Sequence, residues 1–230
     1  MSGPDGAGAH AAGAQEPVSK PGRGRYLGLL GVLALAVVIV VALLNGPREL
    51  HGIPPGKKFA PFAVPLASGN LSGDANVATR AGEGQEGSVP ACSVRGSQIL
   101  NICQLWERGP VVLAVFVDSG SCRKVLGEMQ ALKGSFPGVQ FAGVALKGSR
   151  RSLRALIRSQ SLTLPVGIDA DGSLQGIYKV LSCPQVSFAY PYGKVQSPAL
   201  LSTPTAATLR SRVAALVAAA KARGWREPAR

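Results

Sequence analysis

Residues that bind metal ions or form active thiol pairs are scarce in this sequence. Its 230 residues include only two histidines and four cysteines. His10 and His51 lie far from every cysteine in the chain, and no Cys-x-x-Cys segment is present. A structural metal site needs several such ligands at characteristic short spacings. We therefore expect no metal ion, and no residue pattern points to another cofactor.

Acidic residues are also few. Twelve Asp and Glu stand against 25 Lys and Arg, which gives a formal net charge of +13. A nucleic-acid interface usually gathers its basic residues on one face, often with aromatic residues between them. Here they are scattered, for example at Lys20, Arg23, Arg25, Lys57, Lys58, Arg150, Arg151, Arg154, Arg158, Arg210, Arg212 and Arg223. We expect no nucleic-acid partner and favour attraction to an anionic membrane surface or cell wall.

One long apolar run lies near the N-terminus. Residues 26–44 read YLGLLGVLALAVVIVVALL, without a charge. A helix of this length rises about 28 Å, close to the hydrocarbon thickness of a bilayer. Lys20, Arg23 and Arg25 precede the run, so the positive-inside rule places the N-terminus in the cytoplasm. We expect a single-pass anchor in the cell membrane with an extracytoplasmic C-terminal domain. A cleaved signal peptide is the alternative, although the following NGPRELHG offers no small-x-small cleavage site.

Composition divides the chain into segments. The first residues are rich in Gly and Ala, and Pro47, Pro54 and Pro55 follow the apolar run. Such segments are typical of tails and tethers. The segments we expect are a disordered cytoplasmic tail (1–25), a transmembrane helix (26–45), a linker (46–58), one folded domain (59–224) and a C-terminal tail (225–230).

Hydrophobic periodicity in the second half alternates between strand and helix. VVLAVFV at 111–117 and VQFAGVAL at 139–146 are continuous apolar runs, typical of strands buried on both faces. After each run, apolar residues recur at the intervals of a helix. The predicted helices cover 122–136, 149–160, 171–179 and 204–222, the last with Thr203 as its cap, and further strands cover 185–190 and 194–201. This order predicts an α/β fold, a mixed central sheet with helices on both faces.

Three segments carry a family resemblance. They read GKKFAPFAVPL at 56–66, GPVVLAVFVDSGSCRKVLGEMQAL at 109–132 and SCPQVSFAYPYGKV at 182–195. In this order the chain resembles the membrane-anchored, extracytoplasmic thioredoxin-like proteins of bacteria, the TlpA and redoxin group, over about residues 56 to 224. The resemblance implies a thioredoxin-like fold, thiol–disulfide oxidoreductase activity and a protein thiol or disulfide as the substrate.

The active-site turn of that family, Trp-Cys-x-x-Cys, is degenerate here. Laid on it without gaps, the residues are Asp118 at the tryptophan, Ser119 at the first cysteine, Gly120 and Ser121 between, and Cys122 at the second cysteine. The first cysteine of such a turn is the nucleophile, activated at a helix N-terminus. A serine hydroxyl forms no disulfide, so the ordinary dithiol cycle of the motif is unavailable.

A second cysteine is expected near the turn. The resemblance implies that Pro184 is the cis-proline that packs against the turn, which brings Cys183 toward Cys122. Outside the cytoplasm an even number of cysteines favours disulfides, and four allow three pairings. We favour a Cys122–Cys183 pair together with a structural disulfide between Cys92 and Cys103.

Three functions stay open at this point. The first is thiol–disulfide exchange through Cys122 with Cys183, and the second is a binding or scaffold domain without catalysis. The third is a thiol peroxidase that uses Cys122, with Ser119 in place of the family's threonine but Val115 where a proline is expected. Asp118 bears on all three: its charge would raise the pKa of a neighbouring thiol, unless it caps the helix with Ser119 or Ser121.

Overall fold

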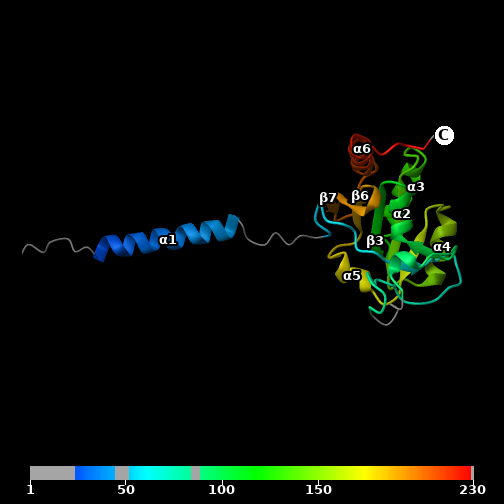
Figure 1. Ribbon diagram of the computed structural model, residues 1–230, viewed down its shortest axis with the longest axis horizontal. Helices are drawn as coiled ribbons and strands as arrows, with labels where there is room; N and C mark the ends of the chain where they lie inside the picture. Colours follow the sequence, from blue (N-terminus) through cyan, green and yellow to red (C-terminus); the bar gives the residue numbers. More distant parts are fainter. Residues whose placement is uncertain (1–23, 45–51, 84–88, 229–230) are drawn as a thin grey trace, which may run out of the picture. The chain divides into compact units, whose positions relative to one another are not determined.

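The computed structural model describes residues 24–44, 52–83 and 89–228, and within helix α1 (Gly24–Leu44) it describes side chains for residues 30–40. Helix α1 and the domain that follows are separate units (Figure 1). Most of the predicted tail at 1–25, part of the predicted linker at 46–58 and the last two residues of the predicted C-terminal tail at 225–230 lie outside the described residues. None of the helices in the described part of the chain combines the length and the hydropathy that crossing a membrane requires. The transmembrane helix at 26–45 stays a prediction.

A mixed sheet of five strands forms the centre of the domain (Figure 1). The strands are β3 (Val111–Val117), β4 (Gln140–Leu146), β5 (Val166–Asp169), β6 (Gln185–Ala189) and β7 (Val195–Leu200). Their order is β5-β4-β3-β6-β7. Neighbours β3, β4 and β5 pair in parallel, whereas β6 is antiparallel to both β3 and β7. The α/β class and the mixed sheet predicted from periodicity are confirmed.

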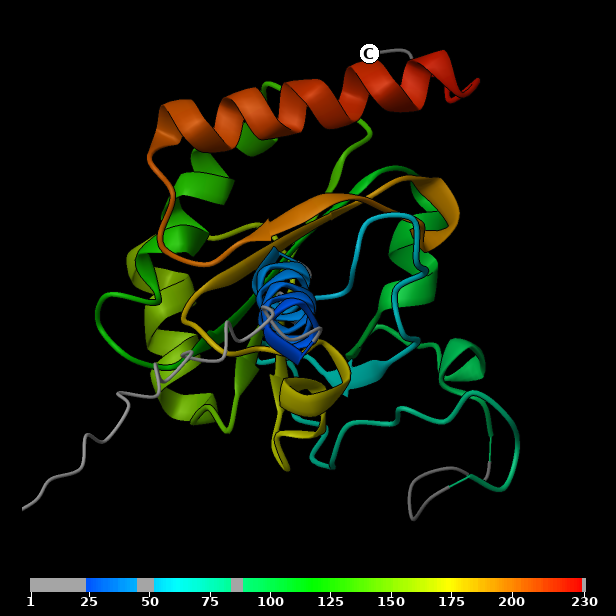
Figure 2. The ribbon, with the colours of Figure 1, turned by 90° about the vertical axis from the view of Figure 1, so that its left-hand side faces the viewer.

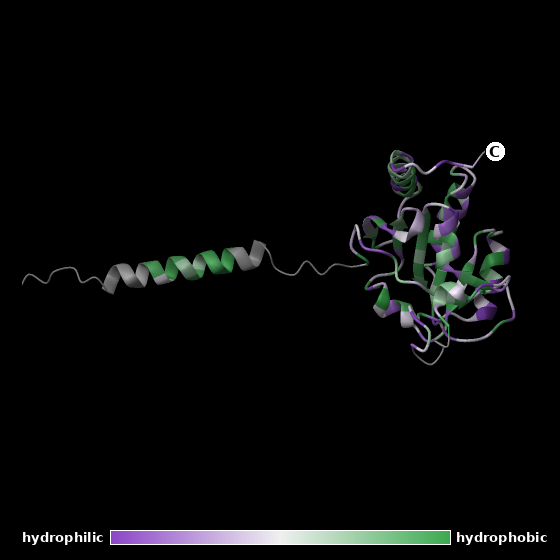
Figure 3. Ribbon diagram, in the orientation of Figure 1, coloured by the Kyte–Doolittle hydropathy of each residue, from purple (hydrophilic) through white to green (hydrophobic). Residues whose placement is uncertain are grey.

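Helices pack on both faces of this sheet. They are α2 (Ile102–Arg108), α3 (Lys124–Lys133), α4 (Arg150–Ser159), α5 (Ser173–Ile177) and α6 (Ala206–Ala222). Apolar side chains of α3, α4 and α6 form one core with every second residue of β3, and those of α2 and α5 form the other core with the residues between. Helices α3 and α6 contact each other on the first face (Figure 2). The apolar strands between these layers stand out in the hydropathy colouring (Figure 3).

Several short elements have no counterpart in the sequence-based prediction. Strands β1 (Ala63–Pro65) and β2 (Ile99–Asn101) pair antiparallel in a small second sheet. Two 3-10 turns are also present, η1 (Ala91–Ser93) and η2 (Pro191–Gly193). Strand β5 and helix α2 were likewise not predicted. The missed strands have three or four residues and α2 has about two helical turns, and none of them carries a continuous or periodic apolar pattern that would identify it.

Helix ends differ from the prediction where tertiary contacts compete. Helix α6 is capped by Thr205, whose Oγ1 accepts a hydrogen bond from the backbone N–H of Thr208 at 3.2 Å. The predicted cap, Thr203, instead donates its hydroxyl to the backbone carbonyl of Ser121 at 3.2 Å. It therefore ties the segment before α6 to the predicted active-site turn.

Candidate active site

Two disulfides join the four cysteines, in the pairing that the sequence favours. Cys122 and Cys183 are bonded with their Cα atoms 5.5 Å apart. Cys92 and Cys103 are bonded with their Cα atoms 5.4 Å apart. No cysteine is left free. The catalytic role of the first pair stays a prediction at this point.

Strand pairing explains why Cys122 and Cys183 meet across 61 residues of sequence. Strands β3 and β6 run antiparallel, with Val115 opposite Gln185. The end of β3 therefore lies beside the start of β6. Cys122 belongs to the turn that leaves β3, and Cys183 belongs to the loop that leads into β6. The peptide bond between Cys183 and Pro184 is cis, as the resemblance implies.

The turn after β3 holds its shape through its backbone. The N–H of Ser119 donates to the carbonyl of Val117 at 2.7 Å, and the N–H of Arg123 donates to the carbonyl of Ser119 at 3.1 Å. Helix α3 begins at Lys124, and its N-cap, Arg123, makes no side-chain capping bond. The alternative that Asp118 caps the helix with Ser119 or Ser121 is therefore wrong.

Asp118 makes an ion pair instead. Its Oδ1 lies 2.7 Å from Nε of Arg123, although the two atoms are not aligned as a hydrogen bond. The same guanidinium donates to the backbone carbonyl of Asp118 at 3.1 Å and to Oγ of Ser152, on α4, at 3.0 Å. A positive partner therefore compensates the carboxylate. This weakens the argument that Asp118 opposes ionisation of Cys122.

The two sulfurs of the Cys122–Cys183 disulfide have different surroundings. Cys122 is 6% exposed and packs in the apolar core under α3, whereas Cys183 is half-buried. The backbone N–H of Val117 lies 3.0 Å from Sγ of Cys183 and donates to it. Hydrogen bonds to the charged form stabilise a thiolate. Cys183 is therefore more accessible to a substrate than Cys122. It also has a hydrogen-bond donor, the N–H of Val117, that would stabilise its thiolate after reduction.

A cavity of about 270 Å³ opens beside Cys183. Its walls come from the ends of β3 and β4, from α5 and from the loop before β6. The lining residues are Val117, Leu146, Lys147, Gln175, Val180, Leu181, Ser182 and Cys183. Val117 is 47% exposed and Leu181 is 65% exposed, so the cavity that Cys183 lines has exposed apolar surface.

Comparison with known proteins identifies the fold. No family model matches the chain, and no curated protein matches it. Among solved structures, a protein of Chlorobium tepidum proposed to be the thiol:disulfide interchange protein DsbE has a TM-score of 0.52 at 17% identity, over 72% of this chain and 99% of that one. The peroxidoxin BcpB of Mycobacterium tuberculosis also has a TM-score of 0.52 at 17% identity, over 72% and 97%. The thioredoxin domain of a thiol-disulfide oxidoreductase from Bacteroides vulgatus has a TM-score of 0.50 at 12% identity, over 70% and 99%. The chain has a thioredoxin-like fold.

In this thioredoxin-like domain the sulfur pair is displaced from the expected turn. Ser119, Gly120 and Ser121 are all exposed, so the turn presents hydroxyl groups where the motif would present its first sulfur. The partner of Cys122 comes from the loop before β6. A dithiol couple is therefore available without the usual nucleophile position.

The geometry also bears on the peroxidase alternative. That chemistry needs Cys122 as a free thiol and an arginine available for the peroxide. Cys122 is bonded to Cys183, and the neighbouring Arg123 is engaged by Asp118 and Ser152. In this oxidised state, neither Cys122 nor Arg123 is available to a peroxide.

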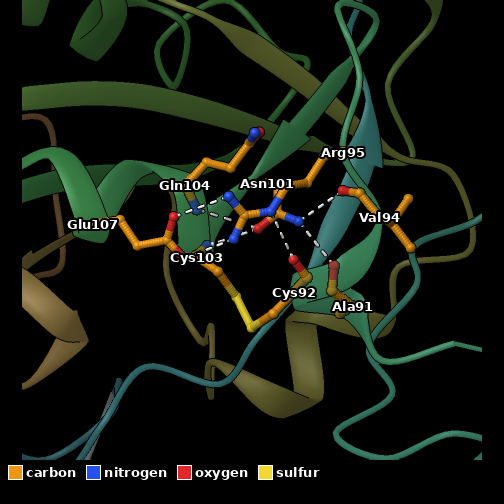
Figure 4. Close-up of polar contacts among 8 residues, drawn as sticks. All are labelled: Ala91, Cys92, Val94, Arg95, Asn101, Cys103, Gln104 and Glu107. Atoms are coloured by element: carbon orange, nitrogen blue, oxygen red, sulfur yellow. Dashed lines mark hydrogen bonds and ion pairs between the residues drawn. A yellow bond between two sulfur atoms is a disulfide. The ribbon is translucent and has the colours of Figure 1, made fainter.

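The second disulfide belongs to a different environment, shown in Figure 4. Cys103 lies in α2 and is 1% exposed. The side chain of Asn101 accepts from the backbone N–H of Cys103 at 2.8 Å and donates to the carbonyls of Ala91 and Val94. Arg95 donates twice to the carboxylate of Glu107 and once to the carbonyl of Cys92. This network fixes the segment around η1 against α2, which suits a structural bridge.

One buried carboxyl group near the cavity went unnoticed in the sequence. Asp169 ends β5, is fully buried, and accepts hydrogen bonds from the N–H groups of Gly172 and Leu174 at 3.0 Å each. Burial, and then the neighbouring Asp171, raise the pKa of Asp169 to about 7. In the described part of the chain, no three His, Cys or acidic residues gather as a metal site would require.

Proposed function

We propose that this chain is a membrane-anchored, extracytoplasmic thiol–disulfide oxidoreductase of the TlpA type that acts through Cys122 and Cys183. The observation that carries the proposal is the asymmetric pair: a half-buried Cys183 beside an apolar-flanked cavity, bonded to a buried Cys122. The substrate class is a protein with a pair of thiols, because exposed apolar surface beside a disulfide suits a polypeptide.

The exchange reaction starts at the accessible sulfur. A substrate thiolate attacks Sγ of Cys183, the Cys122–Cys183 bond breaks, and Cys122 leaves as a thiolate. A second substrate thiolate then attacks the substrate sulfur of the mixed disulfide. Cys183 leaves with the electron pair, stabilised by the N–H of Val117. The substrate is oxidised to a disulfide and this protein is reduced to a dithiol; a partner disulfide reverses the steps and regenerates it.

Trapping tests this order of events. The variant Cys122→Ser keeps Cys183 as the accessible thiol, which can attack a partner's disulfide but has no second thiol in this protein to resolve the mixed disulfide that forms. We expect it to accumulate mixed disulfides with thiol-containing proteins in the presence of a mild oxidant. Cys183→Ser leaves the buried Cys122 and should accumulate few. Equal trapping by both variants, or none by either, would contradict the proposal.

The anchor is the second part of the proposal. The described side chains of α1, at residues 30–40, are apolar or Gly and all are exposed. A continuous exposed apolar surface favours insertion into lipid, and the basic residues before it favour a cytoplasmic N-terminus. Alkaline carbonate extraction tests insertion, and protease added to intact spheroplasts tests the side. Release by carbonate, or protection of the domain from protease, would contradict this part.

A scaffold domain without catalysis is the second candidate, and Ser119 is the observation that favours it. The two candidates differ in one property. A scaffold keeps its Cys122–Cys183 disulfide as a permanent bridge, whereas the oxidoreductase must cycle it.

A further inference from the structure

A second cavity lies at the opposite end of the sheet from the disulfide. Strand β3 begins next to it, after Gly109, and ends at Val117 beside Cys183. Strand β6 runs back along the same path and ends at Ala189, before Tyr190. A strand of seven residues spans about 20 Å. The second cavity is therefore separate from the redox pair.

Aromatic side chains line this cavity. Its volume is about 420 Å³, within the range of small-molecule sites. Tyr190, Tyr192 and Trp225 line it. Trp225 packs against the backbone of Gly109 and Gly138, where the absence of side chains leaves room for its ring. This contact holds the segment after α6 against the domain. Tyr192 is 71% exposed, so its ring is available to a ligand.

The charges around the cavity are unbalanced. Three cationic side chains line it, those of Lys194, Arg223 and Arg226. The guanidinium of Arg223 lies over the ring of Tyr190, 4.4 Å from its centroid. The one acidic residue in the lining, Glu107, already makes a two-bond ion pair with Arg95. Within the described ranges, no Asp or Glu forms an ion pair with any of the three cations.

We propose that this cavity binds a small organic anion that carries a flat ring. Arginine donates paired hydrogen bonds to carboxylate and phosphate groups, and the ring beneath Arg223 holds its guanidinium in place. The exposed aromatic ring of Tyr192 then offers a stacking surface to the body of the ligand. The site has no part in thiol exchange and stands whether or not the redox pair is active.

Phenyl phosphate is the test ligand, because it joins a dianion to an aromatic ring. Binding to the full-length chain in a non-denaturing detergent is measured by calorimetry at low salt, against a detergent blank. We expect saturable binding with one site, at least about tenfold tighter than inorganic phosphate or phenol, since each of these offers half of the recognised chemistry. Inorganic phosphate or phenol binding as tightly as phenyl phosphate, or no binding of phenyl phosphate, would overturn the proposal.

Variants locate the site. Arg223→Gln should weaken phenyl phosphate binding about tenfold, and Arg226→Gln should also weaken it. Arg210→Gln removes the same charge from an exposed position of α6 outside the cavity, and should change binding less than twofold. Far-UV circular dichroism checks that each variant is folded. An equal loss in Arg210→Gln would show a general charge effect and refute the assigned site.

Discussion

The ion pair between Asp118 and Arg123 in the turn after β3 is the basis of a quantitative prediction. Replacing Arg123 by glutamine leaves the carboxylate of Asp118, which is 9% exposed, without its cation. An uncompensated charge at such a site typically destabilises the folded state by about 2–3 kcal/mol. This is below the cost at a fully buried site, because Arg123 is 31% exposed and its contact with Asp118 is not an aligned hydrogen bond. The bonds to Ser152 and to the Asp118 carbonyl add about 1 kcal/mol. Arg123→Gln should therefore destabilise the domain by about 3 kcal/mol.

The matched variant separates charge from packing. Asp118→Asn removes the negative charge but leaves the guanidinium bonded to Ser152, so its cost should be about 1 kcal/mol. The double variant no longer holds an unpaired charge, and we expect it to lose about 1–2 kcal/mol less than the sum of the single variants. Urea unfolding of the oxidised protein, followed by tryptophan fluorescence, measures all three. Additive losses, or an Arg123→Gln loss below about 0.5 kcal/mol, would refute the reasoning.

Three further predictions concern other parts of the domain. Asp169 has a folded-state pKa of about 7 against an ordinary 3.8, so the folded state binds more protons between these values and stability falls as pH rises through that window. Asp169→Asn should flatten this fall by about 3 kcal/mol, measured as the difference in urea unfolding between pH 4 and pH 7. Asn101→Ala leaves one buried carbonyl, one partly buried carbonyl and the start of α2 without partners, and should cost about 2–4 kcal/mol in the same assay. A loss under about 1 kcal/mol would contradict the network. Gly193→Ala places a methyl group 2.5 Å from the ring of Trp106 at a φ of +85°, so its thermal unfolding temperature should fall by several degrees, and an unchanged temperature would contradict the packing.

Much of the architecture was predictable because its main elements are long or strongly apolar. The seven-residue runs of β3 and β4 are buried on both faces, and such runs carry their own signal. Strand β5 has four residues and α2 has seven, so neither shows a recognisable hydrophobic period. Both depend on tertiary contacts with segments that are distant in the sequence. The cap of α6 was misplaced because the hydroxyl of Thr203 is used in a tertiary bond to Ser121, which local sequence cannot reveal.

The sequence predicted which cysteines pair at the site. It did not predict which sulfur is accessible or which charged residues surround the turn. The position of Cys183 before a proline, together with the family resemblance, was enough to suggest its pairing with Cys122. Burial decides which sulfur is accessible, and burial depends on packing of α3 that spacing alone does not give. The Asp118–Arg123 pair was missed because an aspartate before a predicted helix suggests an N-cap. Only the folded turn shows that the guanidinium of Arg123 lies against the carboxylate of Asp118.

The central claim is that the Cys122–Cys183 disulfide is cycled while the Cys92–Cys103 disulfide is a permanent bridge. The direct measurement is a redox titration of the full-length chain, in which thiols released at each potential are alkylated and assigned by mass spectrometry. We expect Cys122 and Cys183 to be released between about −120 and −270 mV, as in exchange proteins, and Cys92 and Cys103 to stay bonded to below about −300 mV. Release of both pairs only below about −300 mV would show that neither disulfide is cycled, and the protein would then be a thioredoxin-like scaffold held by two structural disulfides.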